Sequence, residues 1–241
     1  MKRFDLNKGL AVLAMAGGMF VSSCSNQNTA ATPGKEGQSP AESSFDDQKV
    51  GSVPAGWTAA ETGSKGKPGR WQVMADAAAP STPNVLALTE TLNAGNTMNL
   101  LVAGSRRLKD LEIEVKVKVI SGRTNQGSGV IWRAVDANNY YLARWTGISK
   151  NFRVYCIKDG NAKRLATVDV AADPQQWHTI KVTHLGDRIA ASWDGNQLIT
   201  VSDTTFGAPG TVGVCTKADA AAAFDDFRAR ELSSQISESK K

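Results

Sequence analysis

The segment from Leu111 to Val119 reads LEIEVKVKV and alternates strictly between apolar and charged residues. A period of two sends successive side chains to opposite sides of an extended strand. One face of this segment would therefore be buried, and the other would be solvated. Ile180 to Thr183 continues the same alternation. The pattern predicts β-strands that contribute one face to a hydrophobic core.

Most of the remaining chain between residues 45 and 232 also has the composition of β-strands. Further strands are expected at Gly56–Glu61, Arg70–Ala75, Val85–Thr89, Met98–Val102, Gly129–Ala134, Tyr140–Trp145, Phe152–Ile157, Arg188–Trp193, Gln197–Val201, Gly210–Cys215 and Ala223–Arg230. The Asp-Gly pairs at Asp159-Gly160 and Asp194-Gly195 predict tight hairpins. Because the sequence contains no convincing amphipathic helix of three turns, it predicts an all-β fold, an antiparallel sandwich or barrel.

The N-terminus has the features of a secretory signal. A basic start precedes an apolar run from Leu10 to Val21, which is too short to span a membrane. The small residues that lead to Cys24 resemble the lipobox of bacterial lipoproteins. That resemblance implies that residues 1–23 are removed and that Cys24 carries acyl chains. It also implies the outer membrane in a Gram-negative cell, because Ser25 and not Asp follows. We therefore expect an exported, cell-envelope lipoprotein.

Three segments follow the signal. Residues 24–44 comprise the acylated Cys and a polar stretch without aromatic or branched apolar side chains, which we expect to be a flexible tether. Residues 45–232 are the length of one domain, and residues 233–241 form a polar tail. The chain after residue 23 has 25 basic and 22 acidic residues. Since its charges form no basic stripe, no nucleic-acid partner is expected.

Several short motifs resemble one known superfamily. They are Gly129–Ala134, Asp136–Arg144, Trp177-His178-Thr179, Trp193-Asp194-Gly195, Gly210–Gly213 and Phe224–Phe227. Together they are similar to the concanavalin A-like lectin/glucanase superfamily, in its laminin G-like branch, which includes bacterial domains described as 3-keto-disaccharide hydrolases or glycoside hydrolase family 16-like. The resemblance implies an antiparallel jelly-roll β-sandwich with ligands on a concave face or rim. Gln126–Gly129 departs from the Asn-Ser-Gly pattern of the hydrolase branch.

The carboxylates and histidines do not form a convincing catalytic group. Asp110, Glu112 and Glu114 have the spacing of the glucanase motif but the wrong order of residue types, and their face continues into lysines. His178 and His184 fall on one face of one strand, about 20 Å apart, and cannot share a metal or a proton. The residues therefore favour a binding protein over an enzyme, while the resemblance keeps a glycoside hydrolase-like activity as the alternative.

A group of aromatic and planar polar residues suits carbohydrate, because sugar rings offer apolar faces and hydroxyl edges. The expected ligand-binding residues are Arg133, Asn139, Tyr141, Arg144, Trp145 and Arg153. Alternation places Asn139, Tyr141 and Trp145 on one face of a strand and Tyr140, Leu142 and Arg144 on the other. Only one set can face the core, and the pattern does not decide which. Core aromatics with surface arginines are the alternative reading.

Metal binding and a disulfide are both left open by the sequence. Lectin-like sandwiches often hold calcium through loop oxygens, and the weak candidates here are Asp136, Asp225 and Asp226. No other cofactor is expected. Cys156 and Cys215 would be exported together, so an oxidising compartment permits a bridge between them.

We therefore expect a lipid-anchored envelope protein whose β-sandwich binds a glycan or an envelope polymer. The acyl chains would attach the protein to the membrane. The two alternatives are a glycan-active hydrolase and a structural or protein-binding envelope protein.

Overall fold

The computed structural model describes residues 41–63 and 68–233, and these residues belong to one unit that has its own core. They form fifteen strands, with no helix among them. The described residues therefore include no helix that could cross a membrane. The signal segment, Cys24, most of the expected tether and most of the polar tail lie outside the described residues. The expected all-β class is confirmed.

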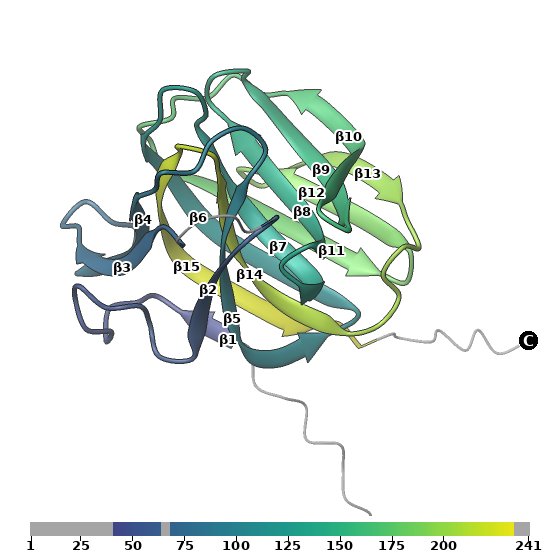
Figure 1. The fold of residues 1–241 in the computed structure, drawn as a ribbon. Helices are drawn as coiled ribbons and strands as arrows, with labels where there is room; N and C mark the ends of the chain where they lie inside the picture. Colours follow the sequence, from purple (N-terminus) through teal and green to yellow (C-terminus); the bar gives the residue numbers. More distant parts are fainter. Residues whose placement is uncertain (1–40, 64–67, 234–241) are drawn as a thin grey trace, which may run out of the picture. The chain divides into compact units, whose positions relative to one another are not determined.

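Two antiparallel sheets make up this unit (Figure 1). The eight-stranded sheet contains β13 (Asn196–Ser202), β12 (Arg188–Trp193), β11 (His178–Leu185), β6 (Leu111–Ser121), β15 (Ala221–Glu231), β4 (Asn84–Glu90) and β3 (Arg70–Ala75) in that order, with β1 (Ala41–Ser43) paired to β15. The seven-stranded sheet contains β10 (Asn161–Asp169), β9 (Asn151–Lys158), β8 (Asn139–Thr146), β7 (Gly127–Asp136), β14 (Gly210–Lys217), β5 (Met98–Leu108) and β2 (Trp57–Glu61).

The main core lies between the two sheets. In β6 every second residue from Leu111 to Val119 is buried there, while the charged residues between them are half-exposed. Tyr141 and Trp145 of β8 belong to the same core, which draws its residues from both sheets. The alternation of β6 therefore places one face in the core, as expected, and burial of that apolar face favours packing of the two sheets.

The outer face of the seven-stranded sheet carries a second apolar cluster. Its buried members are Met98, Leu100, Ile131, Ala134, Tyr140, Leu142, Ile157 and Cys215. These side chains alternate with those of the main core along their strands, so the central strands of this sheet are buried on both faces. The hydroxyl of Tyr140 makes a 2.6 Å hydrogen bond with the hydroxyl of Thr62, the residue that follows β2.

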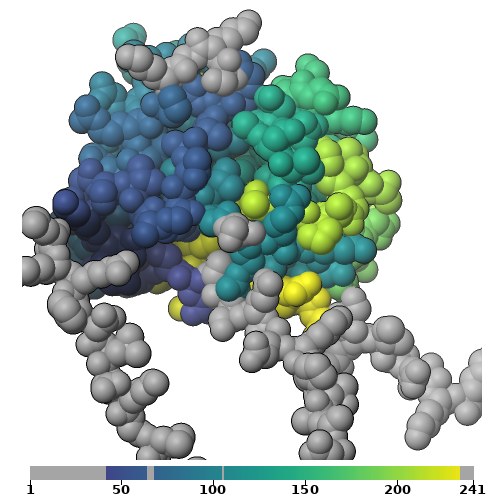
Figure 2. All heavy atoms as spheres, turned by 60° about the horizontal axis from the view of Figure 1, so that its bottom comes forward, coloured from purple at the N-terminus to yellow at the C-terminus, as the bar shows by residue number. Residues whose placement is uncertain are grey.

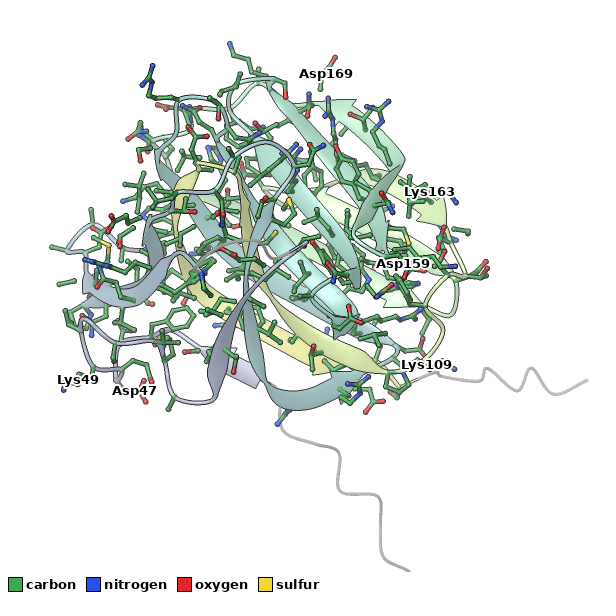
Figure 3. All side chains as sticks on the ribbon, in the orientation of Figure 1. Asp47, Lys49, Lys109, Asp159, Lys163 and Asp169 are labelled. Carbon is green, nitrogen blue, oxygen red and sulfur yellow. The ribbon has the colours of Figure 1, made fainter. Side chains whose placement is uncertain are left out.

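Two strands were not expected from the sequence. β1 pairs with β15 and lies within residues that were assigned to the tether, so the folded unit begins before Phe45. Figure 2 shows the purple residues at this end beside the yellow residues of β15. The other strand is β10, an edge strand that carries the charged residues Lys163 and Asp169 labelled in Figure 3. Charges on an edge strand discourage pairing with a second molecule.

Both expected hairpins form. The first joins β9 to β10, where Lys158 pairs with Asn161, and the second joins β12 to β13. Asp159 and Gly160 have φ values of 51° and 74°. This left-handed backbone is what a two-residue hairpin turn requires, and glycine adopts it without steric cost.

The cysteines do not form a disulfide. Cys156 is buried in the core between the sheets, whereas Cys215 belongs to the second cluster on the outer face of the same sheet. Both thiols are free. Because their side chains leave the seven-stranded sheet on opposite sides, no rotamer change brings the sulfur atoms together.

The two histidines lie on the inward face of β11, as the alternation indicated. His184 is fully buried, and its Nδ1 accepts a 2.9 Å hydrogen bond from Nε1 of Trp132. The proton of the neutral ring must therefore be on Nε2, which is buried without a partner. Burial, with a further contribution from the positive charge of Arg133, lowers the pKa of His184 to about 3. A proton on this ring would consequently oppose the folded state.

The buried imidazole makes stability dependent on pH. The pKa of His184 is lower in the folded state than the ordinary value of 6.5, so its stabilising effect is complete above pH 6.5 and is lost as the pH falls. When the pH falls from 7 to 4.5, we expect protonation of His184 in the unfolded state to lower the free energy of unfolding by about 3 kcal/mol.

His184→Asn keeps an acceptor for Trp132 but cannot be protonated. We expect it to be less stable than the parent at pH 7 and to lose less stability on acidification. Urea unfolding at the two pH values measures the difference. Equal losses in both proteins would show that His184 does not control this pH dependence.

Candidate functional site

A depression of about 470 Å³ opens on the outer face of the seven-stranded sheet. Its lining residues come from β8, β9, β10, β14, the first residue of β5 and three connecting loops. They are Thr62, Asn96, Met98, Leu142, Arg144, Tyr155, Ile157, Gly160, Asn161, Ala162 and Lys217. The volume is within the range of about 300–1,000 Å³ that small-ligand sites occupy. Apolar side chains form part of its floor, and amides and cationic groups surround them.

Two glycines of β7 make room for the arginine of this depression. Gly129 lies directly opposite Arg144 in the β7–β8 pairing. A Cβ at Gly129 would lie 2.8 Å from Cβ of Arg144, and one at Gly127 would lie 2.6 Å from its Nη1. At Gly129 a larger residue would also clash with the carbonyl oxygen of Ala143 and displace the β8 backbone, whereas at Gly127 it would displace the guanidinium of Arg144. These glycines belong to the segment whose sequence departs from the hydrolase pattern.

Arg144 is held against an aromatic ring. Its guanidinium lies 5.6 Å from the ring centroid of Tyr155 on the neighbouring strand β9. This is within the range of a cation–π contact. The Tyr155 hydroxyl accepts a 3.3 Å hydrogen bond from Nη1 of Arg153, and Nε of Arg153 donates to Thr167. The ring thus lies between two arginines that share the outer face of the sheet.

The guanidinium of Arg144 is buried without a counter-charge. The residue is only 5% exposed, and its Nη1 is buried with no hydrogen-bond partner. None of the ion pairs among the described residues includes Arg144, Arg153, Arg164 or Lys217. Arg164 of β10 lies opposite Tyr155 in the strand register and points to the same face.

The positive charges of Arg144 and Arg153 shift the pKa values of two neighbouring groups, Lys217 and Tyr155. Burial and the charges of Arg144 and Arg153 lower the pKa of Lys217. Burial alone would raise the pKa of Tyr155, but the hydrogen bond from Arg153 and the charge of Arg144 outweigh it and leave the pKa below its ordinary value. Both shifts have the sign expected where positive charge accumulates.

The structure brings together two of the six residues expected to bind ligand. Arg144 lines the depression, and Arg153 lies beside it on the same face. Tyr141 and Trp145 instead face the core, where the Tyr141 hydroxyl donates to Asp203 and Nε1 of Trp145 donates to the carbonyl of Val170. The alternation separated these faces correctly, and it is the Arg144 face that points outward.

The other two expected residues hold the fold together away from the depression. Asn139 stands at the start of β8, where its side chain bonds to Asp136 and to the backbone of Asp159. Arg133 occupies a bulge in β7 with a φ of 45° and is 1% exposed. Its guanidinium donates to the carbonyls of Lys109, Phe206 and Gly186, at 2.7, 2.9 and 3.0 Å, and lies 3.5 Å from Asp110.

Several residues of the depression had no detectable signal in the sequence. Lys217 and Asn96 come from strand β14 and from the loop before β5, and only the pairing of strands distant in sequence brings them to the face of Arg144. Tyr155 was inside an expected strand, but its face was not assigned. Arg153, two residues earlier in β9, shares the face of Tyr155 and was the available clue.

The carboxylates considered for catalysis serve structural roles. Glu112 and Glu114 lie on the outer face of the eight-stranded sheet and pair with Lys181, and Glu112 also accepts from Arg230. This agrees with the expectation of an ordinary solvated strand face. Among the described residues lining the depression there is no carboxylate.

The weak calcium candidates are dispersed and have protein partners. Asp225 is buried and accepts hydrogen bonds from Ser81, Asp226 pairs with Lys116, and Asp136 accepts from its own turn. No group of three His, Cys, Asp or Glu residues within the described part of the chain is arranged to hold a metal ion. The three candidate carboxylates are therefore each engaged with protein partners.

Comparison with known proteins bears on the fold. No protein-family description matches the sequence, and no curated protein matches it. Solved structures do match. The carbohydrate-binding module CBM66 from Bacillus subtilis has a TM-score of 0.57 at 20% identity, covering 73% of this chain and 95% of that chain. The chain has the concanavalin A-like jelly-roll fold.

Two further structures with this fold have different roles. The Bacillus licheniformis beta-glucanase has a TM-score of 0.52 at 12% identity, covering 76% of this chain and 96% of that chain. The exoplasmic/lumenal domain of VIP36, in a Ca²⁺/Man-bound form, has a TM-score of 0.51 at 13% identity, covering 80% and 89%. Since the same jelly roll occurs in a carbohydrate-binding module, a beta-glucanase and a Ca²⁺/Man-bound domain, activity must be argued from the site.

The uncompensated charge of Arg144 has a measurable consequence for stability. Replacing a buried charge that lacks a partner by an apolar side chain of similar length removes its desolvation cost. We expect Arg144→Met to raise the free energy of unfolding by about 1 kcal/mol. Urea unfolding at pH 7 measures this change.

Arg133→Met is the matched control, because Arg133 is equally buried but fully hydrogen-bonded. We expect it to lower the free energy of unfolding by about 3 kcal/mol or more. If both substitutions destabilised the protein to the same extent, Arg144 would be a structural arginine like Arg133.

Proposed function

We propose that this chain is a lipid-anchored cell-envelope protein whose jelly roll binds carbohydrate in the depression on its seven-stranded sheet. The anchor and the envelope location rest on the lipobox-like sequence ending in Cys24, and the binding role rests on the depression. The laminin G-like motifs of the sequence are consistent with the same assignment.

The single observation that carries the binding role is the composition of this depression. Tyr155 is half-buried and Ala162 is exposed, so they provide the accessible apolar surface for a sugar ring, while Leu142 and Ile157 line the depression but are almost fully buried. Asn161 and Arg144 offer planar hydrogen-bonding groups for hydroxyl oxygens. An apolar floor with a few converging polar groups is typical of small-ligand sites.

Binding fits this depression better than glycoside hydrolysis. Most glycoside hydrolases use two carboxylates on either side of the scissile bond, one of them as acid. The described residues that line the depression supply cations and amides instead. The carbohydrate-binding module and the lectin found by structural comparison support a sugar ligand as the class to test first.

Filling the depression tests the binding role. Ala162 is exposed on edge strand β10 and lines the depression, so Ala162→Trp should block the site without disturbing the core. We expect the purified protein in detergent to retain at least one ligand on a glycan array, and Ala162→Trp to weaken that binding about tenfold or more.

Ala190→Trp, on the outer face of the eight-stranded sheet, is the matched control and should bind like the parent. Equal binding by Ala162→Trp and the parent would place the site elsewhere on the molecule. An array on which the parent retains no glycan would reject the carbohydrate assignment.

The lipid anchor has its own test. Replacing Cys24 by Ser removes the thiol that would be acylated, and each acyl methylene contributes about 0.8 kcal/mol to membrane binding. We expect Cys24→Ser to move from the membrane fraction to the soluble fraction of cells that express it. Cys156→Ala keeps Cys24 and should stay with the membrane. If Cys24→Ser also remained in the membrane fraction, the proposed anchor would be wrong.

A further inference from the structure

Several basic side chains elsewhere in the described structure have acidic partners. Lys118 pairs with Asp76, and Lys181 pairs with Glu112. Even Lys163, on the same edge strand as the depression, reaches Asp203. Buried or half-buried cations are stabilised by such partners. Of the two buried arginines among the described residues, Arg133 lies near Asp110, whereas Arg144 has no acidic partner and requires a separate explanation.

Four basic side chains lie on the outer face of the seven-stranded sheet, and two of them, Arg144 and Lys217, line the depression. Arg144 comes from β8, Arg153 from β9, Arg164 from β10 and Lys217 from β14, all on the outer face of one sheet. None of them is ion-paired among the described residues. Arg144 is 5% exposed and its Nη1 has no partner. The protein supplies the desolvated cation but leaves its counter-charge to another molecule.

We propose that the depression recognises an acidic sugar, one that carries a carboxylate or a sulfate group, and that Arg144 binds this group. The inference rests on the proposed carbohydrate-binding function and names the class of its ligand. Guanidinium groups bind planar oxyanions through paired hydrogen bonds. Lys217 stands on the other side of the depression as a second positive charge that would attract the same group.

The geometry also disfavours a neutral sugar. A neutral ligand would remove the half-buried Lys217 from water and would leave the already buried charge of Arg144 without neutralisation. An acidic sugar would neutralise that charge while its ring lay against Tyr155 and Ala162. Specificity would then come from the unfavourable binding of neutral sugars as well as from attraction to acidic ones.

Matched pairs of ligands give the sharpest test. The probes are oligomers of galacturonate, glucuronate and mannuronate with their carboxyl-reduced counterparts, and sulfated oligosaccharides with their desulfated counterparts. Calorimetric titration of the purified protein in detergent gives the Kd for each. We expect at least one acidic probe to bind about tenfold or more tightly than its neutral counterpart, and added NaCl to weaken this binding.

Substitutions then assign the charge to its residue. Arg144→Gln should remove the preference for the acidic member of the pair, and Lys217→Gln should reduce it. Arg188→Gln removes an exposed positive charge at the end of β12, on the other sheet, and should leave the preference unchanged. A preference for uronates over sulfated sugars, or the reverse, identifies which oxyanion the site takes.

Three outcomes would overturn the inference. If the neutral and acidic members of every pair bound equally, the site would still be a carbohydrate site but would not select acidic sugars. An acidic preference that survived in Arg144→Gln would assign the selectivity to a different residue. Failure of all probes, neutral and acidic, would reject the proposed function together with this inference.

Discussion

The central strands β7, β8 and β14 of the seven-stranded sheet are buried on both of their faces, and the position of the candidate site follows from this constraint. One face packs on the eight-stranded sheet, and the other carries its own apolar cluster around Tyr140 and Leu142. In β8 every residue from Tyr140 to Thr146 is buried. A polar side chain in such a strand cannot reach water by pointing to the other face, so it must find a partner or leave a buried group unsatisfied.

That constraint explains why the candidate site lies where the outer cluster ends. Arg144 follows Leu142 on the same face of β8, and the side chain crosses the glycines of β7 in place of a further apolar neighbour. The outer cluster provides the apolar floor of the depression, and the interruption of that cluster by charge creates its polar side. A groove formed by curvature of the sheet alone would have no chemical selectivity. The interruption of the apolar cluster by Arg144 instead gives one depression both an apolar and a polar surface.

The sequence predicted the class of the fold well because period-two burial is a local property. Leu111–Val119 identified a half-buried strand without reference to any neighbour, and the Asp-Gly hairpins needed only local turn chemistry. Alternation also separated Tyr141 from Arg144. Which face pointed outward could not be predicted, because it depends on the register between strands far apart in the chain. Lys217 shows the same limit, since its proximity to Arg144 arises only when β14 pairs with β7.

Arg133 and Arg144 show why burial alone does not identify a binding residue. Both are arginines of the seven-stranded sheet, and both are at least 95% removed from solvent. Arg133 donates to three backbone carbonyls and lies near Asp110, so the fold satisfies it completely. Arg144 has an aromatic face and cationic neighbours, but its buried Nη1 has no acceptor. The oxyanion of the proposed ligand would supply the counter-charge that the fold does not give Arg144. The hydrogen-bond and ionic partners of each arginine, and not the extent of its burial, therefore distinguish Arg133, which holds the loops, from Arg144, which is assigned to binding.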